Sequence, residues 1–368
     1  MKSGMDNCNL VFKKLVCLVL VLSLRHQKVF SSPTDSLKFK IGALPSLFYT
    51  PETSLGFGGL VFTYFKTNKT DTSTKKSNTQ SYLSYTLNEQ FSFENDYQIW
   101  SPKNKFYFTG SADITRFPQL YYGIGNSTSE KNHIMMTYDA IRLQTKNFVR
   151  LNNFVYGGLV LNYQLVYNQD IELSSNSCME VYGNMGFEAK GLGPILVIDK
   201  RDNPLNPAKG MYFEASYIDY KNILHNSNTF TSITIDARKY YTLFDRLIWN
   251  GNLYFSNNRG AVPYKMLSEL GGARFLRGYY RGRFRDNNMI VIQQEFRMPV
   301  YKMFGIAIFG GIGKVSKTIQ ELKTNEWHYD YGVGLRVRLN KKENTNLRID
   351  YGRTKDSQGI YVVFAEAF

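Results

Sequence analysis

Apolar and polar residues alternate along most of this chain, in segments of about ten residues or more. In residues 105–114 every second residue is aromatic, small or aliphatic, and the residues between them are mostly polar. The same alternation recurs in residues 232–238, 333–339 and 347–351. A period of two residues predicts β-strands, and a single apolar face predicts that each strand is half-buried.

A soluble β-sandwich would show the same alternation, so segment length and the connections decide between the folds. Soluble strands average about 5–6 residues, which is shorter than these segments. Tyrosines and phenylalanines near the segment ends fit the aromatic girdles of a membrane barrel. Tight turns are expected at residues 51–54, 102–104 and 341–344, and longer polar loops at residues 68–77, 119–133 and 168–184. Short turns at one end and long loops at the other are typical of outer-membrane barrels.

About 16 such segments fit between Phe39 and Phe368, as in a medium-sized barrel. The predicted fold is therefore all-β: a transmembrane antiparallel β-barrel of about 16 strands. Its first strand is expected near residues 39–49 and its last near residues 359–368.

Residues 1–32 are typical of a signal peptide. Lys13 and Lys14 precede an apolar run at residues 15–24, which is shorter than the roughly 20 residues of a membrane helix. A membrane-anchored N-terminus is the alternative. The expected organisation is a signal peptide at 1–32, a short spacer at 33–37 and an outer-membrane barrel at 38–368. Only Cys178 of the three cysteines would remain in the mature chain, so no internal disulfide is expected.

The formal net charge is +15, and residues 1–32 hold five Lys/Arg and one Asp, so their removal leaves +11. Such an excess implies anionic neighbours. The basic residues are scattered among the strands, which argues against nucleic acid and favours outer-membrane lipids and lipopolysaccharide. The four histidines lie far apart, and no metal-ligand or catalytic spacing is present. We therefore expect no catalytic residues, metal or cofactor, and no enzyme activity.

The stretch at residues 270–298 combines a glycine pair, an Arg-Gly-aromatic tip and a polar strand. It predicts a long loop folded into the barrel lumen, with Arg277, Gly278, Tyr279 and Tyr280 at its tip. An unpaired charge inside the lumen is costly, so Arg277 needs an acceptor. Glu295 is the expected partner. The alternative is that Arg277 is a solvated loop residue.

The strand after this loop turns Glu295 and Arg297 to one face, and we expect both to act as barrel-wall partners of the loop. Arg336 and Asp350 belong to the alternating strands further along the chain. They are expected to join Glu295 and Arg297 in a wider network of lumen charges.

Two further groups of residues stand at strand ends. Asp199, Arg201 and Asp202 form a strand-end motif, in which Asp199 and Arg201 either join the lumen network or shape the turn. At the carboxyl terminus Phe364 and Phe368 are expected to form an outer-membrane sorting signal. Their expected position is the lipid face, together with Ile360 and Val362, and Glu366 is expected at the headgroup level. A plain last strand of a soluble protein is the alternative.

Three of these stretches resemble the BamA/TamA family, also called the bacterial surface antigen family. They are residues 191–210 with Asp199-Lys200-Arg201-Asp202-Asn203, residues 270–280 with Leu270-Gly271-Gly272 and Arg277-Gly278-Tyr279-Tyr280, and Glu295-Phe296-Arg297-Met298-Pro299. The resemblance covers essentially the whole mature chain. It implies insertion or translocation of client polypeptides at the outer membrane, through a lateral seam between the first and last strands. Pro45 in the first strand removes one ladder donor, which is compatible with a weak seam.

The chain departs from the family pattern in two ways. Family members usually carry periplasmic POTRA modules, and none is expected here, so clients would be captured by a separate POTRA-bearing or periplasmic partner, or by the barrel's own periplasmic turns. Gly311 stands where the family often has an aspartate that pairs with the loop arginine. Two alternative functions stay open: a passive pore, and a barrel that handles lipid or lipopolysaccharide.

Overall fold

A computed structural model describes residues 40–50, 54–68, 70–71, 73–172, 181–222, 229–244, 246–323, 326–340, 345–364 and 366–368. The expected signal peptide and spacer lie outside these residues and stay predictions. All of the turn expected at residues 341–344, part of the turn at 51–54 and part of the loop at 168–184 also lie outside them.

The fold is all-β, and sixteen of its strands form one antiparallel sheet in chain order. Its strands are β1 (Lys40–Thr50), β2 (Ser54–Phe65), β3 (Ser77–Thr86), β4 (Phe91–Trp100), β5 (Phe106–Tyr121), β6 (Ile134–Arg150), β7 (Val155–Glu172), β8 (Phe187–Asp199), β9 (Gly210–Asn222), β10 (Thr229–Leu243), β11 (Leu247–Gly260), β14 (Asn288–Tyr301), β15 (Phe304–Ser316), β16 (His328–Asn340), β17 (Thr345–Arg353) and β18 (Gln358–Phe364). The expected number of strands is confirmed.

The remaining elements are short. A two-stranded hairpin, β12 (Ser268–Leu270) and β13 (Phe284–Asp286), lies in the connection between β11 and β14. Four 3-10 helices complete the described chain: η1 (Pro102–Asn104), η2 (Glu130–Asn132), η3 (Tyr264–Met266) and η4 (Gln320–Lys323). No helix among the described residues is long and apolar enough to cross a membrane.

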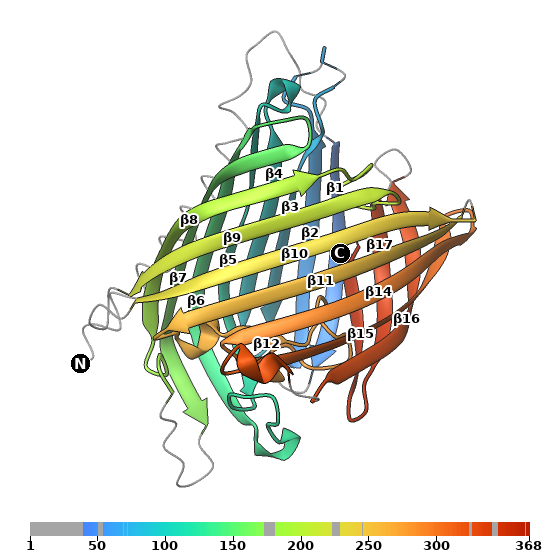
Figure 1. Ribbon diagram of the computed structural model, residues 1–368. Coiled ribbons are helices and arrows are strands. Elements are labelled where there is room, and N and C mark those ends of the chain that lie inside the picture. The colour runs from blue at the N-terminus through green and yellow to red at the C-terminus, as the bar shows by residue number, and fades with distance from the viewer. Residues whose placement is uncertain are drawn as a thin grey trace.

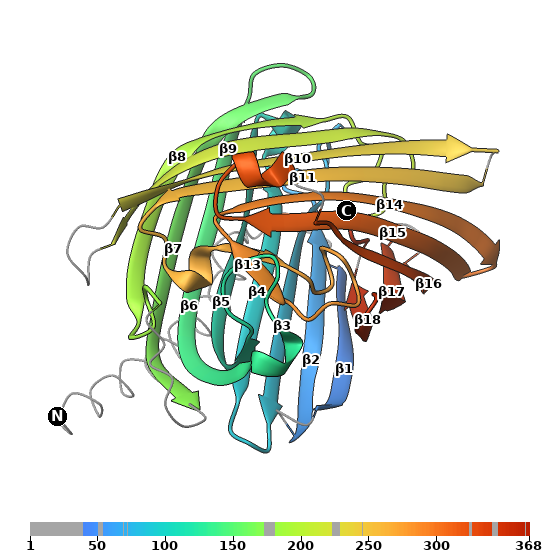
Figure 2. The same cartoon turned by 60° about the horizontal axis from the view of Figure 1, so that its bottom comes forward.

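The sheet curls round on itself, and Figures 1 and 2 both show β1 near the last strands. We call the enclosed space the lumen. Along β14 the buried residues Gln293, Glu295 and Arg297 alternate with the exposed residues Ile292 and Gln294. This is the alternation that the sequence predicts, with Gln293, Glu295 and Arg297 inside. Among the described residues, no strand pairing joins β1 to β18.

Because neighbouring strands are antiparallel, successive connections fall at opposite ends of the sheet. The long-loop end carries residues 122–133, 261–287 and 317–327, and the short-turn end carries residues 101–105 and 302–303. The loop expected at 68–77 is at the short-turn end, so the predicted separation of long loops from tight turns is wrong there.

This loop at the short-turn end is fixed by its neighbour, the turn between β4 and β5. Lys103 donates its backbone N–H to Asp71 at 2.9 Å, and the Asn104 side chain donates to the Ser73 carbonyl at 2.8 Å. In return Asn104 accepts the Lys75 backbone N–H at 2.7 Å. The loop therefore lies folded against the rim.

The last strand is shorter than predicted, because β18 ends at Phe364. Ile360 and Val362 are exposed on the outer face, as expected, whereas the side chain of Phe364 lies outside the described residues. Phe368 is buried and lines an inner cavity with Arg201 and Arg238, and Glu366 pairs with arginines of the lumen. The predicted positions of Glu366 at the headgroups and Phe368 in lipid are therefore wrong. Glu366 turns inward because the buried guanidinium groups form strong charge-assisted hydrogen bonds with its carboxylate.

Candidate functional site

The connection of residues 261–287 enters the lumen and is the inserted loop that the sequence predicts. Figure 2 shows this orange segment inside the curve of the sheet, and β13 contacts β15. Its base carries buried apolar residues, including Tyr264 and Leu267, that pack on the wall of β5–β10. Its tip packs Leu276 and Tyr279 against the β14–β15 wall. The loop thus contacts the wall on two sides.

Arg277 is at the tip and is only 1% exposed. Its Nη1 atom donates to Glu295 Oε2 on β14 at 2.9 Å and to Asp350 Oδ2 on β17 at 2.8 Å. The guanidinium carbon also lies 3.3 Å from the centroid of the Phe309 ring, a cation–π contact. The Arg277–Glu295 pair is the one that the sequence predicts, and the alternative of a solvated Arg277 is wrong.

The backbone of the tip is held by the last strand. Gly278 donates its N–H to the Tyr361 hydroxyl at 2.9 Å, and that hydroxyl donates to the Tyr279 carbonyl at 3.2 Å. Ser357, in the turn before β18, donates to the Gly278 carbonyl at 2.8 Å. Three backbone groups of the tip are therefore paired with side chains at or next to β18.

Gly278 has a φ of +119°, which favours glycine. A Cβ atom there would lie 2.9 Å from Thr354 Cγ2 and 3.0 Å from the Arg353 nitrogen. The tip therefore approaches the β17–β18 turn more closely than a side chain would allow. In the Arg-Gly-aromatic sequence, the glycine between Arg277 and Tyr279 is the residue that permits this close approach.

The two aromatic residues after Gly278 have different environments. Tyr279 is buried, with its ring centroid 5.4 Å from that of Phe284 and 5.8 Å from that of His328. Tyr280 is 39% exposed, and its hydroxyl accepts the Leu120 backbone N–H at 3.3 Å. Tyr279 therefore packs inside the wall, whereas Tyr280 contacts it through its hydroxyl and stays partly exposed.

Around the clamp of Arg277, Glu295 and Asp350, further arginines complete a buried charge network. Arg336 donates to Glu295 at 3.1 Å, to Asp350 at 2.6 Å and to Glu366 at 2.8 Å. Arg348 donates to Asp350 at 2.5 Å. Each acid therefore has at least two arginine neighbours, which offsets the cost of burying its charge.

Arg348 also ties this network to the loop itself, since it donates to the Ala273 carbonyl at 3.0 Å. Arg297, the other predicted wall partner, makes its hydrogen bonds away from the loop tip. It donates to the Pro207 carbonyl at 2.5 Å and to the Asn206 side chain at 3.1 Å, and lies 3.3 Å from Glu366. Arg297 therefore links β14 to the connection between β8 and β9.

The strand-end motif shapes that same connection. Arg201 donates to both carboxylate oxygens of Asp199, at 2.9 and 3.2 Å, and to the Pro204 carbonyl at 3.1 Å. Asp202 accepts backbone N–H groups of Ala208 and Lys209 at 2.9 and 3.2 Å. Of the two interpretations of Asp199 and Arg201, these contacts support the turn-shaping pair. The connection that the motif shapes touches the charge network through Arg297, which bonds Asn206 and Pro207.

The structure also supplies the acid that Gly311 lacks. Gly311 pairs with Gln293 and Asp330 on neighbouring strands, and a Cβ atom there would lie 2.8 Å from Gln293 Cγ and 3.0 Å from Asp330 Oδ1. A side chain at this position would crowd the ladder, and Asp350 on β17 gives Arg277 its second carboxylate instead.

The base of the loop carries a different charge set. Lys265 is buried, with its ammonium 3.9 Å from the Tyr138 ring centroid and in contact with Gln119. Burial lowers the pKa of Lys265 well below its usual value of 10.5. Burial alone would raise the pKa of Glu269, but Arg285 and Arg281 outweigh it and lower that pKa to about 2. Glu269 therefore stays charged across the physiological range.

Two separate cavities lie on either side of the charge network. The larger, about 1330 Å³, is lined by the loop and by residues toward the long-loop end, including Glu94 and Asp113. The smaller, about 300 Å³, lies toward the short-turn end and is lined by Asp96, Arg238 and Phe368. The loop therefore lines the larger cavity, and the charge network borders the smaller one through Glu366.

Sequence reasoning missed Tyr361 and Glu366 as parts of this site. Tyr361 alternates with the outward residues Ile360 and Val362, so its inward direction was readable from the pattern. Glu366 lies beyond the end of β18, where alternation no longer predicts direction. Among the described residues, no cluster of three or more His, Cys, Asp or Glu side chains is arranged to hold a metal ion.

Residues 36–365 match the Omp85 superfamily domain. Among solved structures, BamA from Haemophilus ducreyi lacking POTRA domains 1–3 aligns with a TM-score of 0.56 and 11% identity, over 90% of this chain and 70% of that one. CdiB from Escherichia coli aligns with a TM-score of 0.54 and 10% identity, over 90% of this chain and 63% of that one. CdiB from Acinetobacter baumannii aligns with a TM-score of 0.51 and 12% identity, over 87% and 56%.

These structural likenesses extend to the fold alone, because the identities are low. This chain spans less than two thirds of either CdiB chain. The comparison with curated proteins found no match.

Proposed function

The chain belongs to the Omp85 superfamily, and from this premise we propose that it assists the insertion or translocation of polypeptides at the outer membrane. It is an integral protein of the bacterial outer membrane, with a BamA-like barrel fold. Its clients and the route that they take belong to the proposal.

The observation that carries the proposal is the state of the two edge strands. Neighbouring strands pair throughout the sheet, yet among the described residues no pairing joins β1 to β18. β18 has seven residues, against sixteen to eighteen in β5, β6 and β7, so few hydrogen bonds could hold this seam. Pro45 of β1 lies opposite Gly59 of β2 and, as a proline, removes one N–H donor from the strand.

In the proposed mechanism an exposed strand edge templates an incoming strand through backbone hydrogen bonds. No covalent step is required, so the protein works without catalytic residues. A weak seam lowers the cost of exposing the edge, and a client strand that pairs there satisfies the freed backbone groups within the bilayer. The client would leave sideways into lipid.

The loop clamp has a supporting role in this proposal. Arg277 joins β14 to β17, and the tip backbone joins both to Tyr361 on β18. The wall from β14 to β18 is thereby held as one unit beside the seam. We propose that this unit keeps its shape while the seam opens. We propose that a separate POTRA-bearing or periplasmic partner captures the clients.

The test is the outer-membrane proteome after the protein is depleted. Broad loss of other barrels is the result expected for a general insertase, and loss of one or two surface proteins for a dedicated exporter. If depletion is verified and the outer-membrane proteome is unchanged, the proposal is overturned. Depletion complemented by an Arg277→Ala variant would show whether the clamp serves the function.

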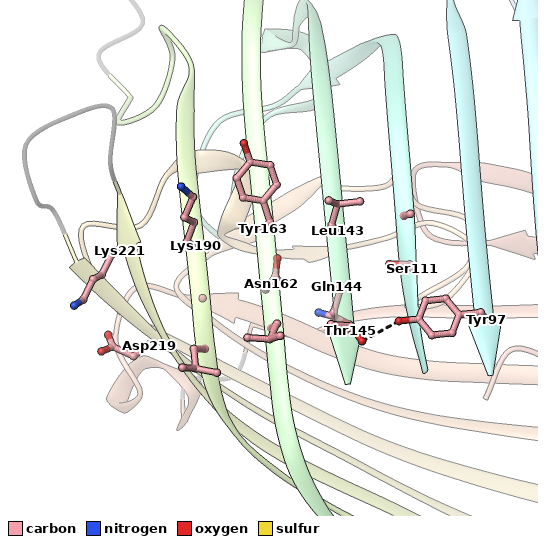
Figure 3. A pocket seen from close by; sticks show the side chains of 14 residues that line it. Tyr97, Ser111, Leu143, Gln144, Thr145, Asn162, Tyr163, Lys190, Asp219 and Lys221 are labelled. Atoms are coloured by element: carbon pink, nitrogen blue, oxygen red, sulfur yellow. Dashed lines mark hydrogen bonds between the residues drawn. The ribbon is translucent and has the colours of Figure 1, made fainter. Parts of the chain in front are cut away.

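One observation favours lipid handling as a second candidate. The outer face of β5–β9 carries a groove of about 720 Å³, lined by Leu143, Leu161 and Leu192. Figure 3 shows Lys190 and Lys221 on two neighbouring strands at this groove. The leucines fit acyl chains and the lysines fit lipid phosphates. Glu188, 3.2 Å from Lys190, and Asp219 on the groove wall reduce this positive charge.

Altered lipid asymmetry at the surface, with a normal proteome, would favour this second function. A passive pore is the third candidate, and it predicts an ion conductance that loop mutations leave unchanged. The loop occupies part of the lumen, which argues against an unobstructed pore.

A further inference from the structure

Glu366 lies two residues beyond the end of β18 and enters the charge network of the lumen. Its Oε2 atom accepts from Arg336 Nε at 2.8 Å and lies 3.3 Å from Arg297 Nη1. Its Oε1 atom accepts from the Asn346 side chain at 2.7 Å. The Glu366 side chain is only 2% exposed. This carboxylate therefore has three partners on three strands: β14, β16 and β17.

The partners of Glu366 lead directly to the loop tip. Arg336 donates to Glu366 through one nitrogen and to Glu295 and Asp350 through the other two. Glu295 and Asp350 are the two acids that hold Arg277. A continuous chain of buried ionic contacts therefore connects Glu366, two residues after β18, with the inserted loop.

We propose that Glu366 is a positioning residue: an ionic latch that fixes the end of β18 to the inner wall and makes the position of this strand depend on the loop clamp. The functional meaning of the latch rests on the proposed seam, because β18 is one of its two edges. The structural claim, that β18 and the loop are energetically coupled, stands by itself.

The coupling follows from the sharing of Arg336. If β18 moved outward, Glu366 would leave two buried guanidinium groups with one acceptor fewer, which is costly. If Arg277 were lost, Glu295 and Asp350 would carry uncompensated negative charge and attract Arg336 more strongly. Arg336 would then hold Glu366 less firmly. Each change therefore loosens the same strand.

The test measures the seam directly. Spin labels are attached to Ile41→Cys and Val362→Cys in a chain whose native cysteines are serines. Both positions are exposed on the outer face, at 65% and 63%, and they lie at the short-turn ends of β1 and β18. The distance distribution between the labels is recorded by pulsed electron resonance in lipid nanodiscs, with no client present.

Glu366→Gln is expected to at least double the population of long label distances. Arg277→Ala is expected to do the same, and the double variant is expected to go no further than the larger single effect. Glu366→Asp, which keeps the charge, is expected to restore part of the closed population. A matched control is Glu94→Gln, which removes a lumen carboxylate that hydrogen-bonds to Ser92, and it should leave the distribution unchanged.

Two results would overturn the latch: a Glu366→Gln distribution that coincides with the wild type, or effects of Glu366→Gln and Arg277→Ala that simply add. If Glu366→Gln does not assemble, Asn346→Ala replaces it, since it removes one bond to Glu366 and should give a smaller shift in the same direction. No shift would then overturn the latch. Because no client is present, this result is independent of the depletion experiment, which alone decides the proposed function.

Discussion

The tip and the base of the inserted loop are held in different ways. At the tip, Arg277 is bound by two carboxylates and the backbone by Tyr361, all with defined directions. At the base, Tyr264 and Leu267 pack in an apolar cluster, and Lys265 lies over Tyr138. Apolar packing tolerates small shifts, whereas buried ion pairs and hydrogen bonds do not. The tip therefore fixes the position of the loop through directed contacts, and the base adds apolar packing beside its own charge set.

The strongest test of this contrast is Arg277→Ala. It leaves Glu295 and Asp350 with one cation fewer, so the free energy of unfolding should fall by roughly 3–5 kcal/mol. Urea unfolding in detergent micelles, followed by tryptophan fluorescence, measures it. Arg274→Ala is the matched control in the same loop, because the side chain of Arg274 is 52% exposed and its pair with Asp236 should contribute below about 1 kcal/mol. Equal losses would mean that the buried clamp of Arg277 contributes no more than an exposed ion pair.

Gly278→Ala should come second. In this variant an alanine must adopt a φ of +119°, and its Cβ atom is pressed against Thr354 and Arg353. We expect the free energy of unfolding to fall by about 1–3 kcal/mol. Gly125→Ala separates the two causes, since Gly125 has the same φ and nothing within 4 Å of its Cβ position. If both alanines cost the same in urea unfolding, the close approach of the tip to the β17–β18 turn contributes nothing.

Tyr361→Phe removes one hydroxyl that accepts from Gly278 and donates to Tyr279. A loss of about 1–2 kcal/mol is expected, because buried backbone groups are left without partners. Tyr351→Phe removes a hydroxyl bonded to Gln358 in an exposed position, and should change the unfolding midpoint little. The tip would not depend on β18 if the two variants behaved alike.

The smallest effect is expected at the base, and it has the opposite sign. Lys265→Met should raise stability by about 1 kcal/mol at neutral pH, because burial opposes the charged lysine. The unfolded chain binds this proton more tightly than the folded one, so wild-type stability should rise with pH toward 10.5 and the advantage of methionine should shrink. Unfolding midpoints at pH 7 and pH 10 check this. A destabilised variant would mean that the cation–π contact with Tyr138 exceeds the burial cost.

Alternation in the sequence predicted the strands and the inward direction of Glu295, Arg336 and Asp350, because a strand face follows from parity alone. The Arg277–Glu295 pair was predictable because a lumen charge requires an acceptor. Asp350 was expected only in the wider network, since the contact of β17 with the loop depends on how the sheet curls. The direction of Glu366 was mispredicted because residues beyond a strand end no longer follow its alternation.

The direct contacts of the loop tip also bear on the order in which the molecule assembles. Glu295, Asp350 and Tyr361 all follow Arg277 in the sequence, and the last two are separated from the tip by more than seventy residues. In synthesis and export Arg277 and Gly278 therefore precede Glu295, Asp350 and Tyr361, which hold them. Contacts of such long sequence separation form late, because the entropy of closing the chain must first be met. A docked tip can exist only after β17 and β18 are in place, so its docking marks a completed wall.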